Sequence, residues 1–438
     1  MGASARIGRD VGLVRGDGFA GRCRTSPADF TRRRKMPADL LALSVVARKG
    51  RTLKIELREL AREAEMDEAI SAPGYLKARE KLNPKALLCL AQHHAANVYA
   101  DGDYETYKGM LVVAVDGTTV NVPTTPETLE RYGDASSGGA RPQAVMGVSA
   151  AYDAINRQLL DLTLNRGFFD ERAQVSVHAG ALPGVVGDLP FMLVMDRGYP
   201  SLPLIAELAD AGVPFVMRCQ SRFMSPEFRR AAAAGADLEV ESRLTASRLS
   251  RTKERDPEAY ERLKGRALKA RYVLIDVGAE SPERLVTNIP AEALSPDELK
   301  EVYHLRWGVE TCFQMLKDRL QVENMTGTKP VLIEQDVYAS AYLLNAAFDL
   351  ANEAESGIEQ ERYKHTMTVS KSLAIGVLKD ELVGLVLADD SERDAMMSAI
   401  AAELRRNVVP VRRNRRHPRD GLGSHRSCKY SNTHKRVF

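Results

Sequence analysis

The stretch LVVAVDG, residues 111–117, decides the fold, because it joins an apolar strand to a carboxylate. Its valines are β-branched and favour a strand, and a continuous apolar run is typical of the centre of a sheet. Asp116 follows this run directly, and FMLVMD at 191–196 places Asp196 after another such run. Open α/β sheets bind ligands at the carboxyl ends of their strands. We therefore expect the two aspartates to lie together at one edge of a sheet.

The segments around these strands predict a core in the order strand, strand, strand, helix, strand, helix, strand. The expected strands are 111–117, 143–153, 157–165, 191–196 and 214–219, and the expected helices are 170–180 and 201–212. The first helix begins with acidic residues, which suit the positive end of a helix dipole, and the second ends at Gly212. Segments 143–153 and 157–165 are expected to form hairpins with the first strand.

A second informative stretch is YHLRWGVETCFQMLK, residues 303–317, with the spacing Y-x2-R-x3-E-x6-K. At about 100° per residue, steps of three, seven and fourteen residues return to nearly the same side of a helix. Tyr303, Arg306, Glu310 and Lys317 should therefore share one helical face. A carboxylate flanked by two cations and a phenol suits a metal ligand beside nucleic-acid phosphates.

The start of this helix is predicted upstream of the motif. Ser295 is a suitable cap, Pro296 fits the first turn, and acidic residues follow.

The four-residue motif and the two strand-end aspartates together resemble the signature of the insertion-sequence-4 family of acidic-triad (DDE) transposases. The matched region covers about residues 75 to 345. The resemblance implies an α/β fold with a ribonuclease-H-like catalytic core and a mixed sheet. It also implies a β-rich insertion between the second and third carboxylates and a helical N-terminal region.

In this family pattern Asp116, Asp196 and Glu310 are the catalytic carboxylates and the metal ligands. Carboxylates are the ligands that Mg²⁺ prefers, and two such ions can activate a nucleophile and stabilise a leaving oxygen. We expect two Mg²⁺ ions, with Mn²⁺ as a substitute, and Asp116 as the ligand that both ions share.

The same resemblance implies that Tyr303, Arg306 and Lys317 bind phosphates near the cleaved DNA end, since arginine grips a phosphate bidentately and lysine acts as a point charge. The alternatives are a buried anchor ring for Tyr303 and an i, i+4 ion pair between Arg306 and Glu310.

The implied reaction is cut-and-paste transposition, in which the enzyme nicks the transposon end, forms and reopens a hairpin, and joins the 3′-OH ends to target DNA. The implied partners are double-stranded DNA, both the inverted-repeat ends and the target, and a second copy of the chain on that DNA.

Some members stack a flipped base on a tryptophan in the insertion. The only tryptophan here is Trp307, which lies inside the motif and is interpreted as core packing. Four aromatic residues remain as candidates for stacking a base. They are Phe223, Phe228, Tyr260 and Tyr272.

The chain divides into six regions. They are a basic, disordered N-terminus at 1–35, a helical DNA-binding region at 36–105, a catalytic core at 106–219 and 296–350, an insertion subdomain at 220–295, a helical C-terminal region at 351–410 and a basic tail at 411–438. In the DNA-binding region Lys77, Arg79 and Lys81 are candidates for phosphate contacts, against the alternative of an ordinary exposed helix face.

Charge is concentrated at the two ends of the chain. Residues 411–438 hold nine Lys and Arg against one Asp, and residues 1–35 hold nine against three Asp, whereas the whole chain carries only +3. Basic ends suit contact with a polyanion, and solvated disorder is the alternative. Met36 offers an alternative start.

The composition argues against a membrane protein, a structural zinc site and an ATP-binding site. No apolar run approaches the ~20 residues of a membrane span. The five cysteines form no C-x-x-C pair, which fits a reducing cytoplasm without structural zinc. His93 and His94 are interpreted as a surface pair. There is no Walker-type lysine loop, so we expect no ATP.

Three other functions stay open. They are a recombinase with Tyr303 as covalent nucleophile, a nuclease of the same fold without strand transfer, and a catalytically silent, transposase-derived DNA-binding protein. The first leaves the three carboxylates without a role, and the intact motif argues against the third.

Overall fold

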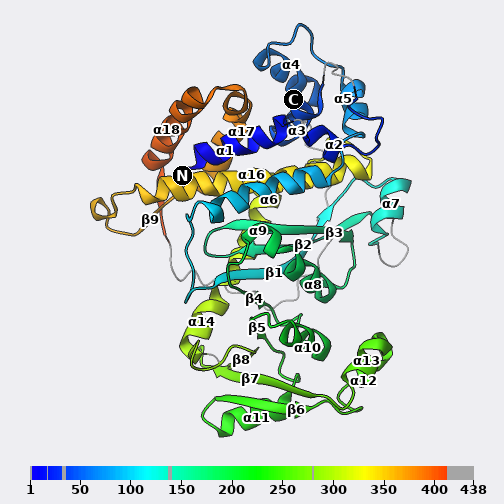
Figure 1. Ribbon diagram of the computed structural model, residues 1–438, viewed down its shortest axis with the longest axis vertical. Coiled ribbons are helices and arrows are strands. Elements are labelled where there is room, and N and C mark those ends of the chain that lie inside the picture. Colours follow the sequence, from blue (N-terminus) through cyan, green and yellow to red (C-terminus); the bar gives the residue numbers. More distant parts are fainter. Residues whose placement is uncertain (1, 17, 32–35, 137–140, 279–280, 412–438) are drawn as a thin grey trace.

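A mixed sheet of eight strands runs through the molecule in the order β3-β2-β1-β4-β5-β8-β7-β6 (Figure 1). The computed structural model describes residues 2–16, 18–31, 36–136, 141–278 and 281–411. The strands of the sheet are β1 (Leu111–Asn121), β2 (Val145–Asp153), β3 (Gln158–Arg166), β4 (Phe191–Met195), β5 (Phe215–Arg218), β6 (Asp237–Arg243), β7 (Ala267–Ile275) and β8 (Glu283–Thr287).

The topology confirms the predicted α/β class and the ribonuclease-H-like strand order. β1 pairs with β2 and β2 with β3 in antiparallel hairpins, while β1, β4 and β5 are parallel neighbours. All five core strands and both core helices, α8 (Glu171–Ala181) and α10 (Leu202–Asp210), form within a few residues of their predicted limits.

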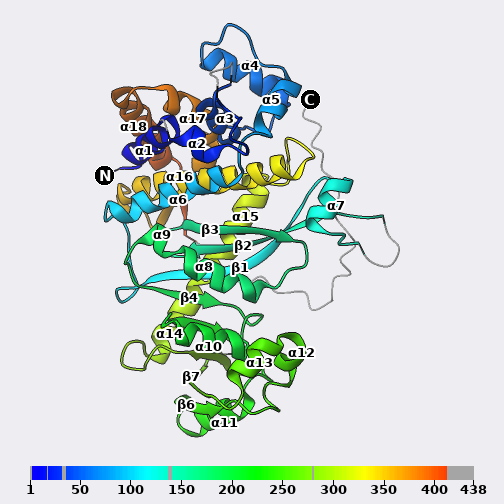
Figure 2. The ribbon, with the colours of Figure 1, turned by 45° about the vertical axis from the view of Figure 1, so that its right-hand side comes forward.

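The two faces of β1 pack against different helices, because successive side chains of a strand point to opposite sides. Leu111, Val113 and Val115 belong to a core shared with α8, α9 (Pro183–Val186) and α10. Val112 packs with α14 (Pro296–Leu305), and Ala114 belongs to a core that includes α15 (Trp307–Gln314) and α16 (Pro330–Ser356). Helices α8 and α15 thus lie on opposite sides of the sheet (Figure 2).

The insertion extends the central sheet and does not build a sheet of its own. β8 pairs antiparallel with β5, β7 pairs with β8, and β6 forms the far edge. Three short helices accompany these strands at the lower end of Figure 1. They are α11 (Ser225–Ala233), α12 (Ser250–Arg255) and α13 (Pro257–Leu263).

A helical layer covers the β3 side of the sheet, with α6 and α16 side by side in both views (Figures 1 and 2). The remaining α-helices are α1 (Ala3–Arg15), α2 (Phe19–Cys23), α3 (Ala38–Val46), α4 (Leu53–Glu63), α5 (Ala72–Arg79), α6 (Lys85–Ala100), α7 (Pro126–Tyr132), α17 (Lys371–Leu387) and α18 (Asp390–Arg406). None of the described helices combines the length and apolar character that crossing a bilayer requires.

The prediction of disorder for residues 1–35 is wrong where the structure describes this segment. α1 packs into the helical layer, and Arg6 on it is fully buried. The Arg6 guanidinium lies 2.9 Å from Asp349 Oδ2, 3.2 Å from Asp101 Oδ2 and 2.6 Å from Asp103 Oδ2. Pattern reasoning missed α1 because its glycines and arginines hide a narrow apolar stripe.

A second buried contact of α1 corrects the interpretation of the histidine pair. His94 is fully buried, and its Nδ1 lies 2.6 Å from Asp10 Oδ2, while His93 lies 2.7 Å from Asp10 Oδ1. Burial alone would lower the pKa of His94, but the contact with Asp10 outweighs it and raises this pKa to about 9. His94 is therefore a buried ionic anchor, whereas the partly exposed His93 shares the same acid.

Arg79 is also buried, so the prediction that it contacts phosphate is wrong. Its guanidinium donates to Gln335 Oε1 at 2.8 Å and to Asp336 Oδ1 at 2.7 Å, which fastens α5 to α16. Lys77 is exposed and Lys81 is partly exposed, and they remain candidates.

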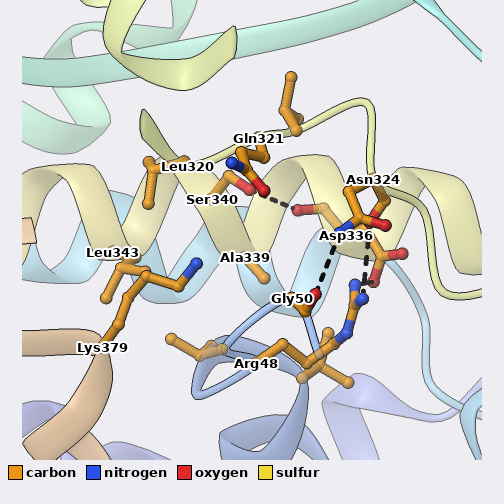
Figure 3. A pocket seen from close by; sticks show the side chains of 13 residues that line it. Arg48, Gly50, Leu320, Gln321, Asn324, Asp336, Ala339, Ser340, Leu343 and Lys379 are labelled. Carbon is orange, nitrogen blue, oxygen red and sulfur yellow. Dashed lines mark hydrogen bonds and ion pairs between the residues drawn. The ribbon is translucent and has the colours of Figure 1, made fainter. Parts of the chain in front are cut away.

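Asp336 also borders a pocket between α3 and α16, which is shown in Figure 3. Arg48 Nη1 lies 3.1 Å from Asp336 Oδ1, and Asn324 donates to the carbonyl of Gly50 at 3.3 Å. The candidate catalytic carboxylates do not line this pocket.

The C-terminal region is helical as predicted at α17 and α18. A two-stranded sheet of β9 (Met367–Val369) and β10 (Val408–Pro410) was not foreseen. The basic tail lies outside the described residues beyond Val411.

Replacing Arg6 with alanine should lower the free energy of unfolding by about 3–5 kcal/mol, because buried carboxylates would lose their cation. Arg22→Ala, on the exposed side of α2, should change it by less than about 0.5 kcal/mol. Urea unfolding followed by circular dichroism measures both. Equal, small effects would show that α1 is not an integral part of the fold.

Candidate active site

Asp116 and Asp196 lie on neighbouring parallel strands at matching levels. The register pairs Ala114 of β1 with Val194 of β4, so two further residues along each strand lead to the two aspartates. Asp116 is still inside β1, and Asp196 follows the last residue of β4. The expected juxtaposition thus follows from the strand register.

Each aspartate is held by the backbone that follows it. The amide of Gly117 donates to Asp116 Oδ1 at 2.8 Å, and the amide of Gly198 donates to Asp196 Oδ1 at 2.7 Å. Both carboxylates are thereby oriented by short local bonds before any ligand is present.

The helix that begins at Ser295 forms as predicted. Ser295 accepts from the Glu298 amide at 3.3 Å, and Glu298 accepts from the Ser295 amide at 2.8 Å, a complete capping box.

The four-residue motif does not lie on one straight helix. α14 ends at Leu305, α15 starts at Trp307, and a π-helical turn spans Met315–Arg319. Such turns often occur at functional sites. Arg306 occupies the joint between the two helices.

Arg306 joins the sheet to the motif helix. Its Nη1 lies 3.5 Å from Asp116 Oδ2 and its Nη2 lies 2.7 Å from Glu310 Oε1. The guanidinium also lies over the rings of Tyr303 and Trp307, at 5.9 and 5.7 Å. The i, i+4 ion pair weighed from the sequence therefore exists, and it extends to Asp116.

The other motif residues lie along the same helices. Lys317 donates to the hydroxyl of Thr118 on β1 at 2.7 Å, and burial lowers the pKa of its ammonium. The Tyr303 ring is buried, which raises the pKa of its phenol. This geometry matches the buried anchor ring considered for Tyr303.

The interpretation of Trp307 as core packing is wrong, since 48% of this residue is exposed. Three of the aromatic candidates for base stacking, Phe228, Tyr260 and Tyr272, are buried and cannot receive a base in this conformation. Phe223 remains partly accessible.

Burial and the charges of its acidic neighbours change the protonation of Asp116. Burial, and then the charge of Asp196, raise the pKa of Asp116 to about 7, although Arg306 opposes the shift. Glu171 on α8 adds to the repulsion. A cation bound between these groups would relieve the repulsion.

The donor set fits divalent ions of the Mg²⁺ type, because it consists of carboxylate oxygens in a strained acidic cluster. Among the described residues no three His, Cys, Asp or Glu side chains form a ready ligand set. Arg306 instead links Asp116 to Glu310, so this guanidinium would have to yield when a metal ion binds.

Two residues near the aspartates were missed by sequence reasoning. Glu171 was noted only as part of an acidic first turn, and Tyr199 was not singled out. Their closeness to Asp116 depends on how α8 and the loop after β4 fold over the sheet, which no local pattern reports. The glycine directly after Asp116 was the available signal.

The strand order of the sheet and the carboxylates on β1 and directly after β4 agree with the core of a DDE transposase that the sequence resemblance implies. Residues 107–346, more than half of the chain, match the family described as the transposase DDE domain, and the chain belongs to this family. Transposases of this family generally use divalent metal ions.

No curated protein matches the chain. Among solved structures, a piggyBac transposase in a synaptic complex with hairpin DNA is similar over 90% of this chain and 85% of that chain, at 12% identity and a TM-score of 0.44.

Asp116→Asn should stabilise the metal-free protein at pH 8 and much less at pH 4. A pKa of about 7 in the folded state, against ~3.9 in the unfolded chain, makes ionisation of Asp116 unfavourable to folding as pH rises between these values. We expect a gain of about 1–3 kcal/mol at pH 8.

Urea unfolding in EDTA at both pH values measures this effect. Asp188→Asn, at an exposed acid before β4, is the control. An equal response of the two variants would mean that Asp116 is not under electrostatic strain.

Proposed function

We propose that this chain is a cut-and-paste DNA transposase of the insertion-sequence-4 type. The observation that carries the proposal is that Arg306 and Glu310 of the motif lie beside Asp116 on β1. Arg306 contacts Asp116, which lies 190 residues earlier, and Glu310, which lies one helical turn later. Asp196 joins them through the parallel register of β1 and β4.

In this proposal Asp116, Asp196 and Glu310 hold two Mg²⁺ ions, for which Mn²⁺ can substitute. When bound there, the ions supply an activated nucleophile and stabilise the leaving oxygen of a phosphodiester. The acidic cluster favours their binding because it is under mutual repulsion without them.

The cations of the motif orient the DNA backbone. Arg306, once released from Glu310, can grip a phosphate bidentately beside Asp116. Lys317, on the π-helical turn, donates to Thr118, which lies two residues beyond Asp116 on β1. Its ammonium offers a point charge for the next phosphate. Tyr303 supports the Arg306 guanidinium with its ring.

The reaction sequence that we propose is nicking of the transposon end, hairpin formation by the freed 3′-OH, reopening, and transfer of the 3′-OH ends into target DNA. The partners are double-stranded transposon ends and target DNA, held by a dimer. A tyrosine recombinase is disfavoured, since burial of Tyr303 makes its phenolate harder to form.

Replacement of Asp116, Asp196 or Glu310 by alanine should abolish Mg²⁺-dependent cleavage of a transposon-end duplex, by at least a hundredfold, while binding of the duplex persists. The reason is that these residues hold metal and not DNA. Gel assays with labelled ends measure cleavage and binding, and Asp188→Asn serves as the active control.

Normal cleavage by any of the three alanine variants would remove that residue from the active site. Supplying pre-cut 3′-OH ends and scoring joined products separates a transposase from a nuclease of the same fold. Absence of joined products with an enzyme that cleaves would favour the nuclease.

Truncation after Pro410 should weaken binding to specific and random duplexes alike and flatten the salt dependence. Each phosphate neutralised by a cation contributes ~0.9 to the slope of log affinity against log salt, and the tail carries nine cations. Affinities measured from 50 to 300 mM salt test this, with cleavage retained at low salt. An unchanged slope would show that the tail does not contact DNA.

A further inference from the structure

Glu171 lies at the start of α8, on the side of the sheet opposite to α15. Its carboxylate lies directly over Gly117, the residue after Asp116. A Cβ atom on Gly117 would lie 2.6 Å from Glu171 Oε1 and 2.8 Å from its Cδ, closer than atoms approach. Gly117 does not have a positive φ. Its missing side chain therefore serves the approach of Glu171 and not an unusual backbone conformation.

A second contact fastens the start of α8 to the other aspartate. Arg172 donates to the carbonyl of Gly198 from Nε at 3.1 Å and from Nη2 at 2.8 Å. Gly198 in turn donates to Asp196. The first turn of α8 thus lies against Gly117 and is hydrogen-bonded to Gly198 in the loop after Asp196. Glu171 therefore reaches the acidic cluster from the face of the sheet opposite to α15.

The charged neighbours of Glu171 on the side of the cluster are the carboxylates of Asp116 and Asp196. Arg172, the next residue in the chain, directs its guanidinium to the carbonyl of Gly198. A half-buried carboxylate facing two others is unfavourable unless a cation joins them.

Tyr199 is an independent sign of a polar site at this position. The residue is fully buried, and its hydroxyl makes no hydrogen bond of full geometry. It faces Glu171 and lies near Asp116 and Asp196. A buried hydroxyl without a good partner costs about 1–3 kcal/mol, so its retention points to a role in holding a group in this cluster.

We propose that Glu171 is a fourth carboxylate of the divalent-ion site and that the Tyr199 hydroxyl positions it. This inference rests on the proposed function. Four carboxylates match the positive charge of two divalent ions, which three do not. Glu171 approaches the cluster from the face of the sheet opposite to α15, and Gly117 leaves space for its carboxylate, so Glu171 and Asp116 would hold an ion together.

The test measures metal binding without DNA or turnover. Mn²⁺ is titrated into the full-length protein, and free Mn²⁺ is read by electron paramagnetic resonance. Glu171→Gln should weaken the tighter Mn²⁺ site at least tenfold, and Tyr199→Phe should weaken it several-fold, as is usual when a group supporting a ligand is lost.

Asp170→Asn is the matched control. Asp170 is the neighbouring acid, and its side chain caps α8 by accepting from the Arg172 amide, a role that asparagine retains. The control removes the same charge one residue away and should leave the tight site within twofold of the original protein. Unfolding in EDTA verifies that each variant folds.

A second variant tests the contact directly. Gly117→Ala should displace the Glu171 carboxylate and weaken Mn²⁺ binding, whereas in a Glu171→Ala background it should have no further effect. Unchanged Mn²⁺ affinity in Glu171→Gln overturns the proposal. If Asp116→Asn also leaves the affinity unchanged, the metal site of the proposed function fails as well. If Asp116→Asn weakens Mn²⁺ binding and Glu171→Gln does not, Glu171 is not a ligand, and the metal site of the proposed function still stands.

Discussion

The parallel pairing of β1 with β4 is the contact on which the fold and the candidate site both depend. It sets the direction of the central strands and brings Asp116 and Asp196 to one edge. Without it the two aspartates would have no reason to meet, because β2, β3 and the helices α7, α8 and α9 separate them in sequence. The hairpin β1-β2-β3 and the extension β5-β8-β7-β6 then build outward from this pair.

Charge repulsion is the constraint that this pairing creates. A sheet edge that collects carboxylates must be neutralised, and in this structure Arg306 does so for Asp116 and Glu310. The break between α14 and α15 falls at Arg306, where the chain brings the guanidinium closest to β1. We infer that this arginine is the internal counter-ion of the metal-free protein and that it turns to DNA phosphate when metal ions replace it.

Features that depend on local sequence were predictable. The apolar runs of β1 and β4, the hairpins and the Ser295 cap each follow from a few neighbouring residues, and the structure has them within a few residues of the expected limits. Features that depend on distant partners were not. Histidine and arginine usually lie at least partly at the surface. His94 is buried because it contacts Asp10, which lies 84 residues away, and Arg79 is buried because it contacts Asp336 on α16.

Trp307 shows the reverse error. An isolated tryptophan on an apolar helix suggests core, but at the first position of α15 it lies beside the Arg306 guanidinium and faces solvent. Gly117, directly after Asp116, was a local signal of a close approach, but only the folded structure shows that Glu171 at the start of α8 makes this approach.

Helix α16 determines how the helical N-terminal region relates to the site. Asp336 near its start holds Arg48 and Arg79 of the N-terminal region, and Asp349 near its end holds Arg6 of α1. These ion pairs are buried, so separating them would leave uncompensated charge at a cost of several kcal/mol each. The same helix packs on β3 and on the π-helical turn that carries Lys317, the last residue of the motif. DNA bound by the N-terminal helices would therefore be held at a fixed distance and angle from the carboxylates. Selection of the cleavage position can then follow from this rigid geometry, without contacts to the bases at the point of cleavage.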